Sequence, residues 1–366
     1  MIKNYIIFAD NKTYKTMKHL LLTVAFLSAI LFSSCSAEDE PNNYDSYWTY
    51  IDENEQEGLN AIYKALGLDN DRTYDYWAKN LASRFFRSPY VSSDLSKFRG
   101  LAFGYDSTSN RLVVKGMSLY VSYAPNGFSL PDIFDKFKHL ESFELKYTIG
   151  VLKEIPPTLC DVPLKELRIR PLELESEISG INGTLPKNFG KLAETLEILD
   201  IKNSQYGNEF LDLVIKEFKN LKECHLVSNN FTGKVPENLD KFSDKLEKCD
   251  LGHNHFTGKV PYMENWQTVY YCFDNNEFTE FDWTYIDNFE DFKRFCSERI
   301  YPPRFRDNNI SGKLPDYFNQ DFFDYYREDF GVVNSYIATF LRGNPLYDEY
   351  NRISLKEFWG IDITPQ

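Results

Sequence analysis

LKECHLVSNNFTGKVPENLDKFSDK, residues 221–245, is followed at once by LEKCDLGHNHFTGKVP, residues 246–261. When the second segment is laid over the first, the same residue types recur at a constant offset of 25. The aligned pairs are Leu221 and Leu246, Cys224 and Cys249, Leu226 and Leu251, Asn229 and Asn254, Phe231 and Phe256, Gly233 and Gly258, and Pro236 and Pro261. The two segments are therefore copies of one internal repeat.

The repeat has the pattern of a short strand followed by a tight turn. Counted from its first residue, apolar side chains stand at places 1, 4 and 6, and asparagine stands at place 9. This pattern predicts a strand with one buried side and then a turn that encloses a polar side chain. One such unit is too small to bury its apolar edge alone, so the copies have to stack as a solenoid.

The spelling LxxLxLxxNxFTGxVP resembles the plant-type leucine-rich repeat. Parts of the same register recur as INGTLP at 181–186, DNNEFTEF at 274–281 and RDNNISGKLP at 306–315. The resemblance implies an α/β solenoid, a leucine-rich-repeat horseshoe with parallel β-strands on its concave face.

The register predicts about eight repeats between residues 114 and 324, with insertions around 170–181 and 283–299. Repeats start near Val114, Leu140, Leu164, Leu196, Leu221, Leu246, Thr268 and Ile300. Places 1, 4 and 6 are predicted to be core. Their residues are Leu140, Phe143, Leu145, Leu164, Leu167, Ile169, Leu196, Leu199, Ile201, Leu221, Cys224, Leu226, Leu246, Cys249, Leu251 and Tyr271.

Place 9 is predicted to be a ladder of buried asparagines. An amide buried without partners costs about 1–3 kcal/mol, so each side chain must bond to backbone groups of its turn. The predicted members of this structural ladder are Asn229, Asn254, Asn276 and Asn308.

Both ends of the array are predicted to be capped, because a terminal repeat leaves its apolar side open. In NEQEGLNAIYKALG, residues 54–67, apolar side chains fall on one helical face, with Asn54 as the N-cap and Gly67 as the stop. This stretch resembles the ALxxLYxAxGG…W cap found ahead of many bacterial repeats. Residues 51–113 are therefore predicted to be the N-terminal capping region, and residues 325–366 an irregular C-terminal cap.

Residues 1–34 have the features of an export signal. Lys18 precedes a 13-residue, largely apolar run from Leu20 to Phe32, which is too short for the ~20 residues of a membrane-spanning helix. Two serines then lead into Cys35, and the whole resembles a bacterial lipoprotein signal in which this cysteine is acylated. A plain cleaved secretory signal is the alternative. Translation from either Met1 or Met17 is open, and Met17 leaves the simpler signal.

The SAEDEP segment after Cys35 resembles the acidic tether of Bacteroidetes lipoproteins. The resemblance implies a lipid anchor in the outer membrane, with the domain facing the cell exterior and residues 35–50 as a flexible tether. The chain has a formal net charge of −14 over 366 residues and is 42% hydrophobic. Such an acidic chain is a poor candidate for nucleic-acid binding, which needs a surplus of Lys and Arg on one face.

Places 2, 3, 5 and 7 are predicted to face outward on the concave side, where such solenoids present a surface to partners. Place 5 runs Ser118, Glu144, Arg168, Asp200, His225, Asp250, Cys272, Arg304, and place 7 runs Tyr120, Lys146, Arg170, Lys202, Val227, Gly252, Asp274, Arg306. Arginine and aromatic side chains are common interface anchors, and rings beside carboxylates suit sugars. The predicted ligand-binding residues are Lys146, Arg168, Arg170, Asp200, His225, Asp250, Tyr270, Asp274, Tyr301 and Arg304.

With Cys35 acylated, five cysteines remain, so at least one is unpaired. Cys224 and Cys249 share place 4 on adjacent repeats, where free thiols in the core are favoured over a disulfide. Cys272 with Cys296 is a weaker pairing possibility.

No catalytic or cofactor motif stands out. His253 and His255 flank Asn254 in a turn without a third metal ligand in view, so they are predicted to be turn residues rather than a metal site. The chain contains no HExxH, GxSxG or CxxC motif. We therefore predict no catalytic residues, no metal and no cofactor.

The sequence predicts a non-catalytic cell-surface binding module that docks a protein or glycan on the concave face. Two other classes stay open. A cell-surface hydrolase acting on glycans, or an accessory subunit of one, would need a suitably spaced carboxylate pair, and carboxylates are plentiful. A purely structural role in the envelope would leave the concave face featureless.

Overall fold

The computed structural model describes residues 51–66, 100–172, 179–265, 268–288, 290–291, 304–313, 315–317, 344 and 346–347. All of them belong to one compact unit, Tyr47–Gln366. The predictions for the export signal, Cys35, Gly67, Cys296 and Tyr301 lie outside the described residues. No helix in the described ranges has the length and hydrophobicity needed to cross a membrane.

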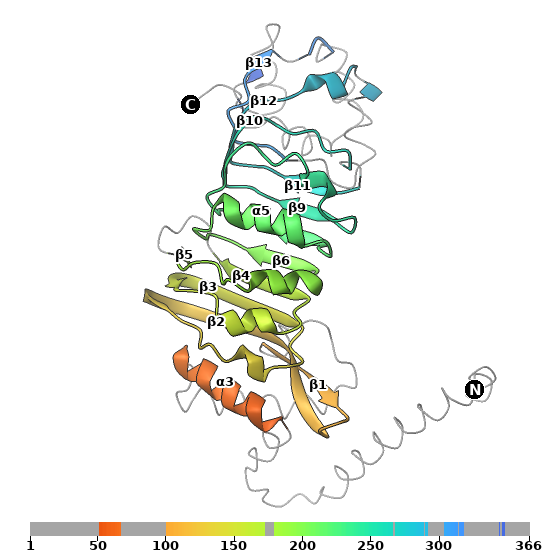
Figure 1. Ribbon diagram of the computed structural model, residues 1–366. Helices are drawn as coiled ribbons and strands as arrows, with labels where there is room; N and C mark the ends of the chain where they lie inside the picture. The colour runs from red at the N-terminus through yellow and green to blue at the C-terminus, as the bar shows by residue number, and fades with distance from the viewer. Residues whose placement is uncertain are drawn as a thin grey trace, which may run out of the picture. The chain divides into compact units, whose positions relative to one another are not determined.

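The strands predicted from the repeats pair side by side in a nine-stranded sheet within the described residues. The sheet order is β1-β2-β3-β4-β6-β7-β9-β11, with β5 paired to β3, so successive repeats add strands in chain order (Figure 1). Every pair in it apart from β1–β2 is parallel, as the solenoid prediction requires. The strands are β1 (Leu101–Asp106), β2 (Arg111–Phe128), β3 (Ser142–Leu152), β4 (Glu166–Pro171), β5 (Ser179–Ile181), β6 (Ile198–Ile201), β7 (Glu223–His225), β9 (Lys248–Asp250) and β11 (Tyr270–Cys272).

Short helices connect the strands, because a chain that returns to a parallel strand needs a crossover. They stack in the same order as the strands: η2 contacts η3, η3 contacts η4, and η4 contacts α5. The helices of the repeats are η2 (Phe134–Lys136), η3 (Pro157–Asp161), η4 (Phe189–Glu194), α5 (Asn208–Glu217), η5 (Leu239–Lys241) and η6 (Trp283–Tyr285).

The FTG segments of the repeats form a second strip of parallel strands. β10 lies between β8 and β12, and β13 pairs with β14. Between these strips and the main sheet, the rings of Phe231, Phe256 and Phe278 are buried, with neighbouring ring centroids 5.9 and 6.2 Å apart. The strands are β8 (Thr232–Gly233), β10 (His255–Lys259), β12 (Glu277–Glu280), β13 (Gly312–Lys313) and β14 (Leu346–Tyr347).

The predicted core and the asparagine ladder are both confirmed. Every residue predicted at places 1, 4 and 6 is buried, and so are all four ladder asparagines. Asn254 is typical of the ladder: its amide donates to the carbonyls of Leu226, Leu251 and Gly252 at 2.9–3.1 Å. Its Oδ1 accepts the backbone N–H groups of Asn229 and Phe231 at 2.9 and 3.2 Å. Each asparagine thus closes its own turn and ties it to the preceding repeat.

Place 8, just before the ladder, has a left-handed backbone in five successive repeats. This conformation is strained for most residues and is best tolerated by residues with short polar side chains. The five residues, with φ between 53° and 59°, are Asn203, Ser228, His253, Asn275 and Asp307. The turn geometry therefore explains the polar residues at this place.

Helix α3 (Glu53–Ala65) falls within the predicted N-terminal capping region, and it contacts β2 and η2. The predicted face is confirmed in that Leu59, Ile62 and Tyr63 are buried. The predicted N-cap is wrong: Asp52 takes this position, and its carboxylate accepts the N–H of Asn54 at 3.0 Å. An aspartate two residues earlier accepts the free N–H groups of Asn54 and Glu55 and adds favourable charge at the helix start.

The capping region also contains an antiparallel hairpin that the sequence analysis did not predict. β1 pairs with the first half of β2, from Leu101 opposite Met117 to Asp106 opposite Arg111. The first repeat begins at Val114, inside β2, which continues as the parallel partner of β3. β1 therefore covers the edge of the sheet that a bare first repeat would leave unpaired.

Glu55 is a buried carboxylate on the inner face of α3, and we predict that it makes stability pH-dependent. Burial raises the pKa of Glu55 to about 7, against the opposing effect of the Val114 N–H, which it accepts at 2.6 Å. The folded chain then holds this proton more tightly than the unfolded one, so the stabilisation present below pH 4.5 is lost as the pH rises toward 7.

Glu55→Gln keeps an acceptor for the Val114 N–H but cannot ionise. At pH 8 its free energy of unfolding is expected to exceed that of the parent by roughly 1–3 kcal/mol, so it unfolds at a higher denaturant concentration. At pH 4.5 the two proteins should differ little. Urea unfolding at the two pH values measures this. Glu53→Gln, on the exposed side of the same helix, is the control and should show no such pH-dependent gain. Equal stability of Glu55→Gln and the parent at pH 8 would contradict the prediction.

Candidate functional site on the strand face

The strand face is the side of the main sheet that carries places 2, 3, 5 and 7. Its register is as predicted across all eight repeats at place 5. The cross-strand partners run in one unbroken row: Ser118, Glu144, Arg168, Asp200, His225, Asp250, Cys272, Arg304. The predicted residues are therefore brought together on one surface by strand pairing alone.

At place 2 of the strand face, charges alternate in sign from one repeat to the next. Place 2 runs Lys115, Glu141, Lys165, Glu197, Lys222, Glu247. Glu141 bonds to the lysines on both sides at 2.8 and 2.7 Å, and Glu197 bonds to Lys222 at 2.6 Å. Opposite charges on directly paired residues stabilise a sheet, whereas like charges destabilise it. Many charges of this face are thus already paired with one another.

A first charge cluster spans β2, β3, β4 and β6. Glu144 receives hydrogen bonds from Arg170 at 2.7 Å and from the Ser118 hydroxyl at 2.8 Å, and it pairs with Lys146 at 2.9 Å. Burial acts to raise its pKa, but these donors together lower the pKa of Glu144 below its usual value. The carboxylate is therefore ionised and held by cations from its own strand and the next.

Asp200 lies two repeats further on and is the most deeply buried carboxylate of this cluster. Its Oδ2 accepts Arg170 at 3.1 Å, with Arg168 3.9 Å away, and its Oδ1 lies 3.9 Å from Lys202. Two arginines and one lysine thus surround a single carboxylate.

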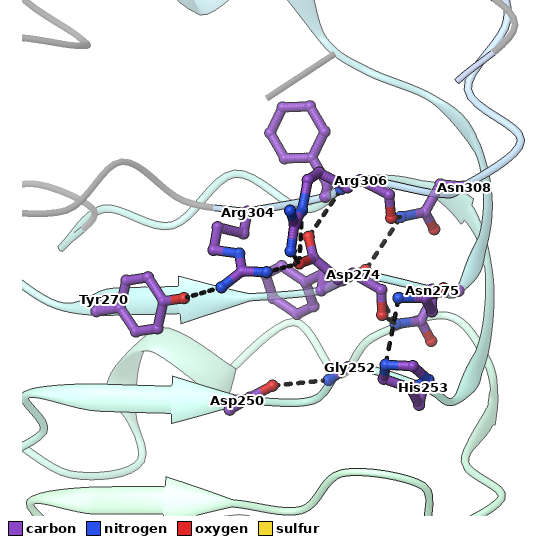
Figure 2. A network of polar contacts seen from close by, with 12 residues as sticks. Asp250, Gly252, His253, Tyr270, Asp274, Asn275, Arg304, Arg306 and Asn308 are labelled. Carbon is purple, nitrogen blue, oxygen red and sulfur yellow. Dashed lines mark hydrogen bonds and ion pairs between the residues drawn. The ribbon is translucent and has the colours of Figure 1, made fainter. Parts of the chain in front are cut away.

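A second charge cluster is drawn in Figure 2. Asp274 accepts the side chain of Arg304, and it accepts Arg306 through the backbone N–H at 2.8 Å and the guanidinium at 3.0 and 3.1 Å. Arg304 also reaches the hydroxyl of Tyr270, at 3.4 Å. Burial raises the pKa of Asp274 to about 7, and Arg304 pulls it down.

Asp200 and Asp274 were predicted to face outward and be exposed, and the prediction of exposure is wrong. They lie on the predicted face but are only 2% and 3% exposed, and Cys272 is buried as well. Arginine side chains from neighbouring repeats reach these shorter carboxylates, since long side chains span the ~4.8 Å between strands, and Lys202 of the same repeat approaches Asp200 as well.

The repeats between the two clusters carry His225, Glu223 and Asp250 on the strand face. His225 lies 3.2 Å from Glu223 on its own strand, and Glu223 pairs with Lys248 at 2.9 Å. The Oδ1 of Asp250 accepts the N–H of Gly252 at 3.0 Å, which turns it toward its own backbone (Figure 2). In the middle of the strand face, Glu223 is therefore held by His225 and Lys248, and Asp250 by a backbone N–H.

The two histidines of the GHNHF segment belong to the turn of their repeat, and both rings contact the next repeat. His253 has the left-handed backbone of place 8, and its ring lies 3.3 Å from the amide of Asn275 (Figure 2). The ring of His255 lies 2.7 Å from Glu277 on the next repeat. Among the described residues, no group of three or more metal-ligating side chains is present.

Cys224 and Cys249 are direct cross-strand partners and are free thiols in the core, as the sequence analysis favoured. Cys160 and Cys272 are free and buried too. All four act as small apolar side chains.

The sequence analysis left three participants out of its site and ladder. Lys202 and Arg306 were placed at place 7 but not assigned to the ligand-binding set, although each faces a buried carboxylate. Asn344 extends the ladder by one repeat: its Oδ1 accepts the N–H of Ile310 at 3.1 Å, and its amide donates to Phe305 at 2.9 Å. The spelling LxxNxL at 341–346 repeats the ladder pattern and could have identified it.

No protein-family model and no curated protein matches this chain. A plant ice-binding protein is similar in structure at 18% identity and a TM-score of 0.46, over 73% of this chain and 83% of that one. The leucine-rich-repeat ectodomain of the Arabidopsis thaliana receptor kinase SOBIR1 is similar at 21% identity and a TM-score of 0.37, over 56% and 94%.

A third similar structure is the ectodomain of the Arabidopsis receptor kinase HAESA with a peptide hormone ligand, at 17% identity and a TM-score of 0.42. It covers 67% of this chain and 35% of that one, so the chain spans about a third of its length. The parallel strands in register and the buried asparagine ladder show that this chain folds as a solenoid of stacked repeats.

Proposed function

We propose that the protein is a non-catalytic binding module that docks a protein or glycan ligand on the strand face, as the concave face of a leucine-rich-repeat horseshoe. A lipid on Cys35 would hold it at the outer membrane, facing the cell exterior. The solenoid supports this proposal because it gives eight repeats one continuous surface on which side chains far apart in sequence act together.

The observation that carries the proposal is the layering of charge on the strand face. In the first cluster the cations Lys146, Arg168 and Arg170 are 22–32% exposed, whereas the carboxylates of Glu144 and Asp200 are 12% and 2% exposed. The second cluster repeats the arrangement, with two arginines about 30% exposed over Asp274 at 4%.

Within the two clusters this layering places the cations outside the carboxylates, on a chain whose formal net charge is −14. A guanidinium paired with one carboxylate still has N–H donors left for another group. The ligand best matched to such a surface is acidic, and the attraction would raise its association rate and weaken as salt screens the charges.

The proposal is tested with Arg168→Gln combined with Lys202→Gln. Neither side chain hydrogen-bonds within the described residues, so the change removes charge from the face at little cost in stability. Binding of an acidic probe, such as a glutamate-rich peptide or an acidic oligosaccharide, is expected to weaken about tenfold or more and to depend less on salt.

The matched control is Lys191→Gln, which removes a positive charge paired with Asp161 on the helical side of the repeats. It should bind the probe as the parent does. Binding that is independent of salt, or equal loss in the control, would contradict docking on the strand face.

The hydrolase alternative gains no support from the strand face. A glycosidase needs two carboxylates flanking open space for the sugar. In the part of the chain that the structure describes, Glu144, Asp200 and Asp274 are each covered by cations that donate to them. This arrangement favours binding over acid–base chemistry.

A further inference from the structure

The strand face is wider at the first charge cluster than in the later repeats. β2 and β3 run for 18 and 11 residues, whereas β6, β7, β9 and β11 are three or four residues long. From β7 onward the chain turns at a buried asparagine in place 9. The second and third repeats carry Thr148 and Leu172 at this place instead, so no ladder asparagine turns the chain there.

The alternation of side chains along the strands puts both of these residues on the strand face. Successive side chains of a strand point to opposite faces. From Ser142 to Thr148, the residues at every second position of β3 are partly exposed, and those between them are buried. β4 alternates in the same way as far as Pro171, and Leu172 follows as an exposed residue. Thr148 and Leu172 therefore extend the strand face beyond place 7.

Two large, exposed apolar side chains stand on this extension. Tyr120, at place 7 of the first repeat, is 51% exposed, and Leu172 is 53% exposed. The hydroxyl of Tyr120 lies 2.9 Å from that of Thr148, and the N–H of Leu172 donates to the carbonyl of Tyr147 at 2.8 Å. Thr148 thus connects the two apolar residues across β3. We call Tyr120, Thr148 and Leu172 the rim.

The rim adjoins the cations of the first cluster. Tyr120, Lys146 and Arg170 are successive cross-strand partners. Leu172 follows Arg170 by two residues, which is about 7 Å along a strand. The side chains of Lys146 and Arg170 are 32% and 31% exposed. An exposed apolar group therefore lies next to an exposed cation twice, Tyr120 beside Lys146 and Leu172 beside Arg170.

These neighbouring groups define the chemistry of a ligand. The cations pair with carboxylates, and the rim gains free energy by burying other apolar surface. An extended peptide carries side chains i and i+2 on one side about 7 Å apart, which matches the spacing of rim and cations. A sugar presents mainly hydroxyls, for which the side chain of Leu172 has no donor or acceptor, and the Tyr120 hydroxyl is already engaged with Thr148.

We propose that the rim and its cations bind an extended acidic peptide in which an apolar side chain stands two residues from a carboxylate. The apolar side chain packs on Tyr120 and Leu172, and the carboxylate pairs with Lys146 or Arg170. This inference rests on the proposed docking function and narrows its ligand from a protein or glycan to a polypeptide segment of mixed acidic and apolar composition.

The test compares two peptides of equal charge by calorimetric titration of the full chain. One is a glutamate-rich peptide with a leucine two residues from a glutamate, and the other has serine in place of that leucine. The parent protein is expected to bind the leucine peptide about fivefold to tenfold more tightly. Tyr120→Ser combined with Leu172→Ser should abolish this preference and leave the affinity for the serine peptide unchanged.

Two further variants control for folding and for general hydrophobicity. Leu172→Met keeps an apolar side chain of similar size on the rim, so it should retain the preference for the leucine peptide. Tyr262→Ser removes a ring that is 47% exposed in the segment after β10, outside the strand face, and should bind both peptides as the parent does. The substituted side chains are exposed, so all of these variants should melt within a few degrees of the parent.

Four results would overturn the rim. Equal affinity of the parent for the two peptides would show that no apolar contact forms. A preference that survives in the double variant would place that contact elsewhere, and an equal loss for both peptides would show that the substitutions act through charge or folding. Binding of an acidic oligosaccharide but of neither peptide would keep the docking function and make the ligand a glycan. Failure of all three probes would remove the proposed function as well.

Discussion

Asn254→Ala is expected to lower the free energy of unfolding by about 3–5 kcal/mol. The side chain is 3% exposed, and it donates to three carbonyls and accepts two N–H groups. Alanine leaves the N–H groups of Asn229 and Phe231 without their acceptor and leaves a void in the turn, although the Leu251 carbonyl keeps the Asn276 amide and the Gly252 carbonyl keeps the N–H of Ser228. Because Asn254 joins its own repeat to the preceding one, both should loosen together.

Thermal and urea unfolding of the variant measure this effect. Asn188→Ala is the control, because Asn188 also donates two hydrogen bonds, to Pro157 and Asp161, but at an exposed site where water replaces them. It should cost less than about 1 kcal/mol. Similar costs for the two variants would show that burial of the ladder contributes nothing, and that result would count against the repeat register.

Gly183→Ala is the second substitution with a large expected effect, and its cause is close packing between backbones. A Cβ at Gly183 would stand 2.1 Å from the carbonyl oxygen of Lys153 and 2.9 Å from the Cα of Glu154. Backbone atoms cannot move aside as a flexible side chain does, so the two repeats must separate locally. We expect a loss of about 3 kcal/mol or more, or failure to fold.

Gly190→Ala is the matched control for this substitution. The nearest atom to its added Cβ is a Leu213 methyl at 3.9 Å, an ordinary contact, and the residue lies in η4. Alanine there reduces the freedom of the unfolded chain and should leave stability unchanged or slightly raised. A melting temperature of Gly183→Ala within a few degrees of the parent would contradict the packing argument.

The stacking direction and the core follow from sequence because they depend on a local rule repeated many times. The spacing of Leu246, Cys249 and Leu251 before Asn254 determines which side chains point inward, and every copy repeats it. Place 5 could be traced across eight repeats from this spacing alone, even through the longer repeats. A solenoid makes such inference effective because each repeat contacts mainly its neighbours.

Exposure on the strand face could not be predicted in the same way. Asp200 and Asp274 occupy the same kind of outward place as Asp250, yet the first two are covered by arginines from adjacent repeats. Covering depends on which long side chain stands one repeat away and which rotamer it adopts. The register places the residues in a row but does not fix these orientations.

The capping region was hard to predict because it does not follow the repeat. Asp52 replaces Asn54 as the N-cap, and either residue type satisfies the free amides of a helix start. The β1–β2 hairpin depends on non-local pairing with the first repeat, for which the repeat spelling has no signal. Asn344 is the opposite case, since its pattern is present and only the irregular sequence around it concealed it.

The alternation of lysine and glutamate at place 2 bears on how such an array can change length in evolution. Removing one repeat, such as residues 196–220, would set Lys165 directly against Lys222. Removing two neighbouring repeats would instead restore an opposite pair, Lys165 with Glu247. Gene duplications and deletions that add or remove an even number of repeats therefore keep opposite charges next to each other at place 2, whereas an odd number brings like charges together.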